Sequence, residues 1–143
     1  MDTSKIRKMF ILDEGMRTKP YRCTAGKLSV GLGRNLDDVG ISEDEAYYLL
    51  NNDVERATRA CVAIFGKGLW DRWSENRKLG WLNLAFNLGQ VRLLNFRNTL
   101  RATLREDWPN VEKGLRASLW FKQVGSRAER VIAMIVREEF PYA

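Results

Sequence analysis

One long amphipathic helix divides this sequence into two parts. Ser42 and Glu45 have the serine-to-glutamate spacing in which each residue caps the first turn for the other, so we expect the helix to begin at about residue 43. Apolar residues then recur at helical spacing: Ala46, Leu49, Leu50, Val54, Ala57, Cys61 and Ile64. The pattern predicts a buried stripe along residues 43–64 and a helix long enough to join two lobes.

The segments on either side of this helix differ in character. Residues 1–14 predict a short helix that is capped by Asp2 or Thr3 and stopped by Gly15. Residues 20–34 lose the helical period and predict a β-hairpin around Thr24-Ala25-Gly26-Lys27. Beyond residues 66–68, further helices are expected over residues 79–88, 93–104, 111–119 and 126–139, and the five tryptophans lie in this second half.

These elements predict a predominantly helical α+β fold. A small α+β lobe of about residues 1–45 is expected to be joined by the helix of residues 43–64 to a helical lobe of residues 65–143, all within a single domain. The length of 143 residues and the 45% hydrophobic content suit one soluble globular domain with a core of its own. A cleft between two lobes is a usual place for a ligand.

Two absences bear on where the chain acts. No apolar run approaches the roughly 20 residues needed to cross a bilayer, and the N-terminus lacks the apolar segment of a signal peptide. We therefore expect accumulation in the cytoplasm, with Cys23 and Cys61 as free thiols. A monomer is the default expectation.

The charge and the missing residue types narrow the chemistry. A net charge of +6 and a pI near 9.6 favour a polyanionic partner. Nucleic acid is not expected, because acidic residues interrupt each basic run among the tryptophans. With no histidine, no Ser-His triad and no histidine-containing zinc site can form, and no phosphate or dinucleotide loop is present. We expect no metal and no cofactor, so catalysis would depend on carboxylate, thiol, hydroxyl or arginine.

Three charged residues interrupt otherwise apolar patterns. Glu14 ends the first helix four residues after Phe10, where partial removal from water would suit a general acid. Asp53 falls on the stripe of the long helix, and Arg34 is its candidate partner. Arg127 lies in the first turn of a helix, where the helix dipole disfavours a cation, so a group outside that helix is expected to bind it. Each also has a plainer interpretation as a solvated or structural side chain.

Several ordered motifs resemble the phage lysozymes, or endolysins, of the T-even phage type (glycoside hydrolase family 24). Asp13-Glu14-Gly15, Tyr21, Thr24, Gly26 and Gly31-Leu32-Gly33 resemble the catalytic segment of that family. The stretch from Asp44 to Val54 resembles the start of its interlobe helix. The helical lobe is matched by Phe86-Asn87-Leu88-Gly89, Trp120 and Ser126-Arg127-Ala128-Glu129-Arg130.

The resemblance implies a muramidase that cleaves the β-1,4 bond between N-acetylmuramic acid and N-acetylglucosamine in peptidoglycan. Glu14 falls on the family's general acid and Arg127 on the arginine that pairs with it. Asn87 and Trp120 fall near the substrate-binding positions of the cleft. The family also implies storage in the host cytoplasm and action in the periplasm after a holin-type membrane lesion. The positive charge of the chain suits lipopolysaccharide or the anionic outer membrane as a further partner.

Three positions depart from the family pattern. Cys23 stands where an aspartate is usual, which leaves three mechanisms: the thiolate acts as a base for water, the thiolate acts as a nucleophile, or Glu14 acts alone with assistance from the substrate. Ser29 replaces a threonine that positions the attacking water and keeps its hydroxyl. Arg34 replaces a histidine, with Asp53 as its expected partner.

These departures leave two alternatives to hydrolysis. A lytic transglycosylase needs only the one glutamate, because the 6-hydroxyl of the muramic acid takes the place of water. A protein that has lost activity would remain a wall-binding or nucleic-acid-binding domain. Activity on purified peptidoglycan separates these alternatives.

Overall fold

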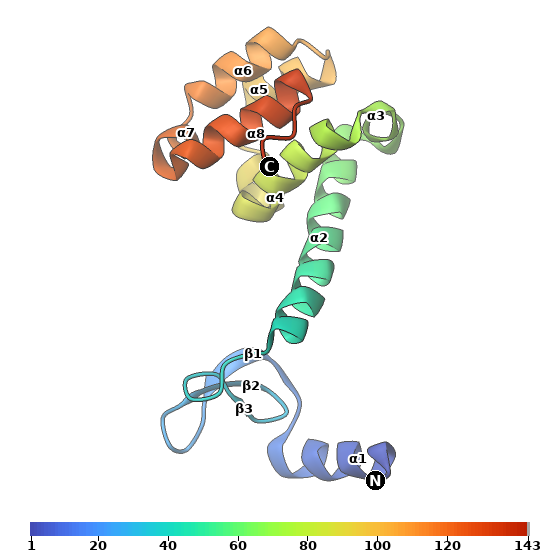
Figure 1. Cartoon of the computed structure of the whole chain (residues 1–143), viewed down its shortest axis with the longest axis vertical. Coiled ribbons are helices and arrows are strands. Elements are labelled where there is room, and N and C mark those ends of the chain that lie inside the picture. Colours follow the sequence, from blue (N-terminus) through green and yellow to red (C-terminus); the bar gives the residue numbers. More distant parts are fainter. Residues whose placement is uncertain (143) are drawn as a thin grey trace. The chain divides into compact units, whose positions relative to one another are not determined.

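The computed structural model describes residues 1–142, and the chain divides into two compact units, Met1–Leu49 and Leu50–Ala143. Eight helices and three strands follow one another in the order α1, β1–β3, α2–α8 among the described residues (Figure 1). The prediction of a predominantly helical α+β fold is confirmed. The two units are described separately below.

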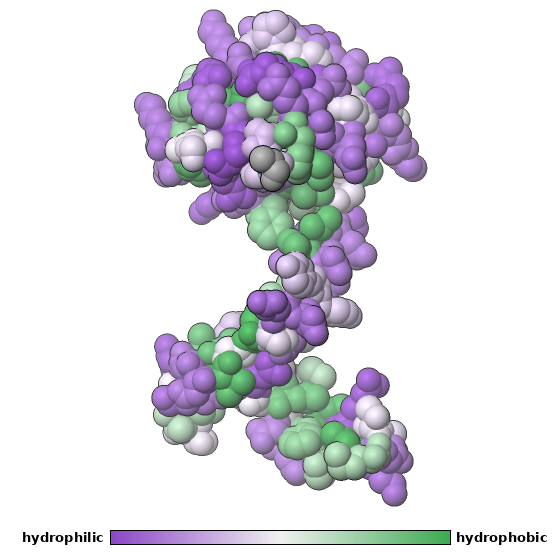
Figure 2. Space-filling view, in the orientation of Figure 1, coloured by the Kyte–Doolittle hydropathy of each residue, from purple (hydrophilic) through white to green (hydrophobic). Residues whose placement is uncertain are grey.

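Helix α1, Thr3–Glu14, begins and ends as its sequence predicts. The Asp2 side chain accepts hydrogen bonds from the backbone N–H groups of Ser4 and Lys5, and Gly15 closes the helix with a φ of 74°. No residue of α1 is buried, and Phe10 is 41% exposed. Hydrophobic side chains therefore lie on its surface, as Figure 2 shows.

The strands form one antiparallel sheet in the order β1-β2-β3: Arg17–Arg22, Leu28–Gly31 and Arg34–Asn35. The predicted turn is confirmed, because the N–H of Cys23 donates to the carbonyl of Lys27 at 2.9 Å and the N–H of Gly26 donates to the carbonyl of Cys23 at 2.8 Å. Strand β3 was not predicted, since two residues are too few to show an alternating pattern.

Helix α2, Glu43–Phe65, confirms the capping pattern in both directions. The Ser42 hydroxyl accepts from the Glu45 N–H and the Glu45 carboxylate accepts from the Ser42 N–H, each at 3.1 Å. The buried stripe was predicted over the whole helix, and for the first half that prediction is wrong. Burial is confined to Ala57, Ala60, Cys61 and Phe65, because an apolar stripe is buried only where another element covers it.

Six further helices form the second unit. They are α3 (Lys67–Arg72), α4 (Glu75–Leu93), α5 (Arg97–Leu104), α6 (Trp108–Arg116), α7 (Leu119–Val124) and α8 (Ser126–Arg137). The four helices that were predicted here correspond to α4, α5, α6 and α8. Helices α3 and α7 were missed, because six residues show too little periodicity.

The core of this unit centres on the contact between α4 and α8. Trp81 and Leu84 of α4 and Ile132 and Ile135 of α8 are fully buried. The helices approach closely at Gly80, where a Cβ atom would lie 2.6 Å from Cγ1 of Ile135. A side chain at position 80 would therefore push α8 away from α4.

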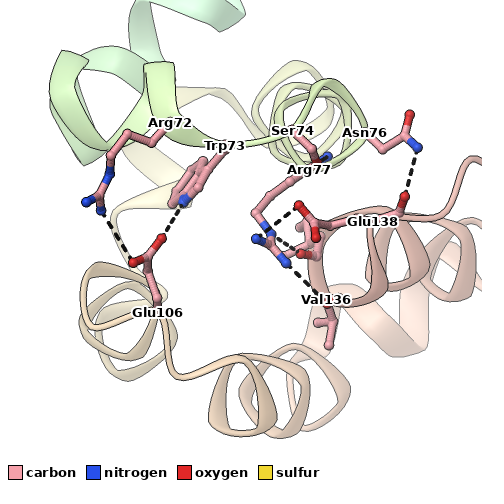
Figure 3. Close-up of polar contacts among 9 residues, drawn as sticks. Arg72, Trp73, Ser74, Asn76, Arg77, Glu106, Val136 and Glu138 are labelled. Atoms are coloured by element: carbon pink, nitrogen blue, oxygen red, sulfur yellow. Dashed lines mark hydrogen bonds and ion pairs between the residues drawn. The ribbon is translucent and has the colours of Figure 1, made fainter.

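Arg77 of α4 binds the end of α8 from a largely buried position. Its Nε donates to the carbonyl of Ile135 at 2.6 Å, and its Nη2 donates to the carbonyl of Val136 at 3.3 Å (Figure 3). Nη1 lies 3.2 Å from the Glu138 carboxylate, and the guanidinium stacks 3.8 Å from the ring centroid of Trp108. Burial lowers the pKa of Arg77, and the carboxylates of Glu138 and Glu106 oppose that shift.

Replacing Arg77 with methionine is predicted to lower the free energy of unfolding by about 2–4 kcal/mol, because charged hydrogen bonds to two carbonyls are lost. Arg72 provides the control, since it makes an exposed pair with Glu106 at 3.4 Å in the same region. Arg72→Gln should change stability by less than about 1 kcal/mol. Denaturant unfolding measures both variants, and equal effects would contradict the role of Arg77.

Candidate active site

Glu14, the last residue of α1, lies against the backbone of Gly33 in the loop between β2 and β3. A Cβ atom at position 33 would lie 2.8 Å from Oε2 and 3.0 Å from Cδ of Glu14. Gly33 also has a φ of 82°, a conformation that other residues rarely adopt. Position 33 therefore requires glycine for two reasons. Its φ is positive, and the Glu14 carboxylate occupies the space that a side chain would need.

The partial removal of Glu14 from water was expected to come from Phe10. That expectation is wrong for this structure, because Glu14 is exposed and Phe10 is itself 41% exposed. An apolar residue four positions earlier on a helix shields a side chain only when both face a covering element.

Cys23 and Ser29 lie together at the turn of the hairpin. Hydrogen bonds from the backbone of Lys27 and of Ala25, and a weaker one from the Ser29 hydroxyl, lower the pKa of the Cys23 thiol. Ser29 is 3% exposed, and its Oγ also contacts the carbonyl of Lys27 at 3.3 Å. The turn therefore stabilises a thiolate with donors that the chain itself holds in place.

Arg34 has a different partner from the one predicted. Its Nη1 donates to both carboxylate oxygens of Glu45 at 2.8 Å and to the carbonyl of Gly40 at 3.1 Å. Asp53 instead pairs with Arg56, three residues later on α2, at 2.6 Å. The predicted Arg34–Asp53 ion pair is thus corrected, because each residue has a partner closer along the chain.

The Arg34–Glu45 pair joins the sheet to the first turn of α2. Hydrogen bonding from Arg34, followed by that from the Ser42 backbone, lowers the pKa of Glu45 to about 2. A depressed carboxyl pKa stabilises the fold above the unfolded value, and this contribution is lost as the pH falls toward 2. The Glu45 carboxyl therefore does not titrate near neutral pH.

In the second unit, the structure brings together two pairs of polar side chains along α4. The Nε1 of Trp120 donates to Oδ1 of Asn87 at 3.0 Å, and the Nε of Arg127 donates to Oδ1 of Asn83 at 2.9 Å. Asn83 and Asn87 are four residues apart and so lie on one face of the helix. Asn83 was missed by sequence reasoning, although its spacing from Asn87 is a usable signal.

Arg127 does have a partner outside its own helix, as predicted. It lies in the first turn of α8, which begins after Gly125 with no side-chain cap, and its partner is Asn83 of α4. The pairing of Arg127 with Glu14 would join the two units, and it stays a prediction.

The described residues contain neither a cluster of metal-ligating side chains nor a helix suited to a membrane. Within residues 1–142, no three cysteine, aspartate or glutamate side chains gather as a metal site. None of the helices in that range is both long enough and apolar enough to cross a bilayer.

Comparison with known proteins finds one family over most of this chain. The family model described as phage lysozyme matches residues 12–137. The pre-baseplate central spike protein Gp5 of Enterobacteria phage T4 is 27% identical over 155 residues, which cover 90% of this chain. Probable T4-type lysozyme 1 of Dictyostelium discoideum is 24% identical and covers 92%. Peptidoglycan hydrolase gp36 of Pseudomonas phage phiKMV is 30% identical and also covers 92%.

These relatives differ greatly in length. The match covers 27% of the T4 spike protein and 15% of the phiKMV hydrolase, but 94% of the Dictyostelium lysozyme. The same unit thus occurs both within much longer proteins and as nearly the whole of a shorter one.

The two thiols are predicted to react very differently with iodoacetamide. In a Cys61→Ser variant, Cys23 should be alkylated at a lower pH than an unstructured cysteine peptide, because its lowered pKa gives more thiolate. Ser29→Ala should shift the pH midpoint of Cys23 alkylation only part of the way toward that of the peptide, since the backbone donors remain. In a Cys23→Ser variant, Cys61 should stay unmodified until unfolding, because burial raises its pKa to about 12. Similar pH profiles for the two thiols would contradict the assignment.

Proposed function

Since this chain belongs to the phage lysozyme family, we propose that it is a muramidase that hydrolyses the β-1,4 bond between N-acetylmuramic acid and N-acetylglucosamine in peptidoglycan. Glu14 is the general acid of this proposal. The observation that carries the proposal is the carboxylate of Glu14 seated against Gly33, inside the segment that the family model matches. The printed name of the phiKMV relative, a peptidoglycan hydrolase, supports the substrate class.

In the proposed reaction, the protonated Glu14 carboxyl donates its proton to the glycosidic oxygen as the bond to the anomeric carbon breaks. Water then adds to that carbon and loses a proton, so each cleavage consumes one water molecule. The sugar passes through an oxocarbenium-like transition state, which carries positive charge. The reaction therefore gains from a nearby anion and from a group that orients water.

We assign these supporting roles to the hairpin turn. Hydrogen bonds to Cys23 favour its thiolate form, and a thiolate stabilises positive charge on the sugar and accepts a proton from water. The Ser29 hydroxyl lies beside it and replaces the threonine of the family pattern. Cys23 is proposed as a helper, because its thiolate replaces only one of the two carboxylates usual in glycosidases.

Asn87, Trp120 and Arg127 are proposed to bind the glycan from the second unit. The Trp120 indole N–H donates to Oδ1 of Asn87. The amide Nδ2 of Asn87 can therefore donate to a sugar oxygen or to an N-acetyl carbonyl. Trp120 is 4% exposed, so its main part is to orient Asn87. Asn83 orients Arg127 in the same way, because it accepts from Nε and leaves the outer guanidinium nitrogens as donors.

Partners and location follow the family expectation. We propose peptidoglycan as the substrate, an anionic envelope component such as lipopolysaccharide as a further partner, and storage in the host cytoplasm until the membrane is breached. Cell fractionation before lysis tests the location, and a periplasmic pool in intact cells would contradict it.

A lytic transglycosylase is the second candidate, and the thiol at position 23 is the observation that favours it. That reaction uses the same glutamate, but the muramic 6-hydroxyl attacks the anomeric carbon and a 1,6-anhydro sugar forms. A Cys23→Ser variant with full activity would favour this candidate, because no helper for water is then needed.

Glu14→Gln is predicted to slow cleavage of purified peptidoglycan by about 100- to 10,000-fold, the range for loss of a general acid. Asp13→Asn is the matched control, since it removes the same charge from the neighbouring exposed position. That variant should keep nearly full activity. Release of soluble muropeptides measures both, and cleavage that survives Glu14→Gln would contradict the assignment. Folded wild-type protein that binds the wall without cleaving it would instead support a binding domain.

Gly33→Ala is predicted to lower the turnover number by about 100-fold, because a displaced catalytic group loses its alignment. Gly31→Ala is the control: its φ of 72° gives a comparable backbone strain, but an added Cβ there meets no atom within 4 Å. Unfolding experiments should show similar stability losses in the two variants. Equal losses of activity would mean that the contact with Glu14 has no role.

A further inference from the structure

The exposed side of α5, together with its C-cap residue Arg105, carries three arginines and no acidic residue. Arg97, Asn98, Arg101, Leu104 and Arg105 face solvent, and we call this set the α5 basic face. Their spacing places them on one side of the helix. The opposite side, Thr99, Leu100, Ala102 and Thr103, is buried in the unit.

The arginines of this face are unpaired within residues 1–142. None of them takes part in an ion pair or a side-chain hydrogen bond there, whereas most arginines elsewhere in the second unit are paired, among them Arg56, Arg59, Arg72, Arg116 and Arg137. The two acids that follow α5 are engaged elsewhere. Glu106 binds Arg72 and the Trp73 indole, and Asp107 caps α6.

Two adjoining grooves, which share Asn98, Arg101 and Gly114 in their linings, extend the cationic surface between α5 and α6. One, of 1010 Å³, is lined by Arg92, Arg97 and Arg101 together with Leu119. The other, of 480 Å³, is lined by Arg101, Arg105 and Lys113. An anion on this surface would therefore meet guanidinium groups from several directions.

We propose that the α5 basic face binds the phosphate headgroups of an anionic phospholipid membrane. Guanidinium groups bind phosphate oxygens in a bidentate manner, and unpaired cations lose no existing partner when they do so. The proposal does not rest on the catalytic assignment.

The apolar residues of the surface favour a membrane over a nucleic acid. Leu104 is 52% exposed and Leu119 is 67% exposed, beside the arginines. Aliphatic side chains among cations suit the boundary between headgroups and acyl chains. Binding of single strands relies on aromatic platforms, but the tryptophan in the groove, Trp120, is 4% exposed and bonded to Asn87.

The test is co-sedimentation of the protein with vesicles of phosphatidylglycerol and phosphatidylethanolamine, compared with phosphatidylcholine vesicles. The triple variant Arg97→Gln/Arg101→Gln/Arg105→Gln should bind the anionic vesicles about 100-fold more weakly, from the usual contribution of each basic residue near such a surface. Binding of the wild type should also weaken as salt is added.

The matched control removes the same charge from paired cations of the same unit: Arg56→Gln/Arg59→Gln/Lys67→Gln. This variant should lose several-fold less affinity than the α5 variant. Leu104→Asn/Leu119→Asn, which keeps every charge, should also weaken vesicle binding. Circular dichroism and unfolding midpoints identify any variant that fails to fold.

Three results would overturn the proposal. Equal weakening by the two triple variants would show a response to net charge only. Absence of wild-type binding to the anionic vesicles would remove the membrane as the partner. Binding of single-stranded DNA that depends on the α5 arginines, without vesicle binding, would assign the surface to nucleic acid.

Discussion

The contact between α4 and α8 is the interaction on which the helical unit depends. Arg77 binds the carbonyl groups at the end of α8 (Figure 3). Gly80 lets the two helices approach closely. Asn83 and Asn87 follow on α4, one and two turns further along, while Arg127 lies at the start of α8. The same packing that closes the core therefore sets the spacing of the proposed glycan-binding side chains.

The first unit fixes the position of its proposed catalytic residue, Glu14, with less buried surface. Its helix α1 has no buried residue, so packing does not fix the position of Glu14. Three local features do so: the Asp2 cap, the end of the helix at Gly15 and the absence of a side chain at Gly33. The Arg34–Glu45 pair ties the sheet to α2 with a carboxylate that stays ionised near neutral pH. Glycine geometry and ion pairing take the place of a large core here.

Local signals in the sequence predicted much of this structure. The capping pattern at Ser42 and Glu45, the turn at Thr24–Lys27 and the helical periods of α4 and α8 depend on neighbours within a few residues, and the structure confirms them. The partner of Arg34 was misjudged, because a charge on a helix face has several possible partners and the backbone decides among them. The exposed first half of α2 shows the same limit, since a stripe does not reveal what covers it.

The candidate site could be predicted only in part for a related reason. Resemblance to the family singled out Glu14, Asn87, Trp120 and Arg127, but the two orienting contacts, Gly33 under Glu14 and Asn83 beside Arg127, come from segments that are distant in sequence. Such contacts have no local signal. They can be identified only from the folded structure.

We propose that this chain hydrolyses the glycan with water as the acceptor. The most direct measurement is mass spectrometry of muropeptides released from purified peptidoglycan in water enriched in heavy oxygen. Hydrolysis should give reducing N-acetylmuramic acid ends that carry the heavy oxygen at the anomeric carbon. Products with 1,6-anhydro ends and no incorporated label would contradict it.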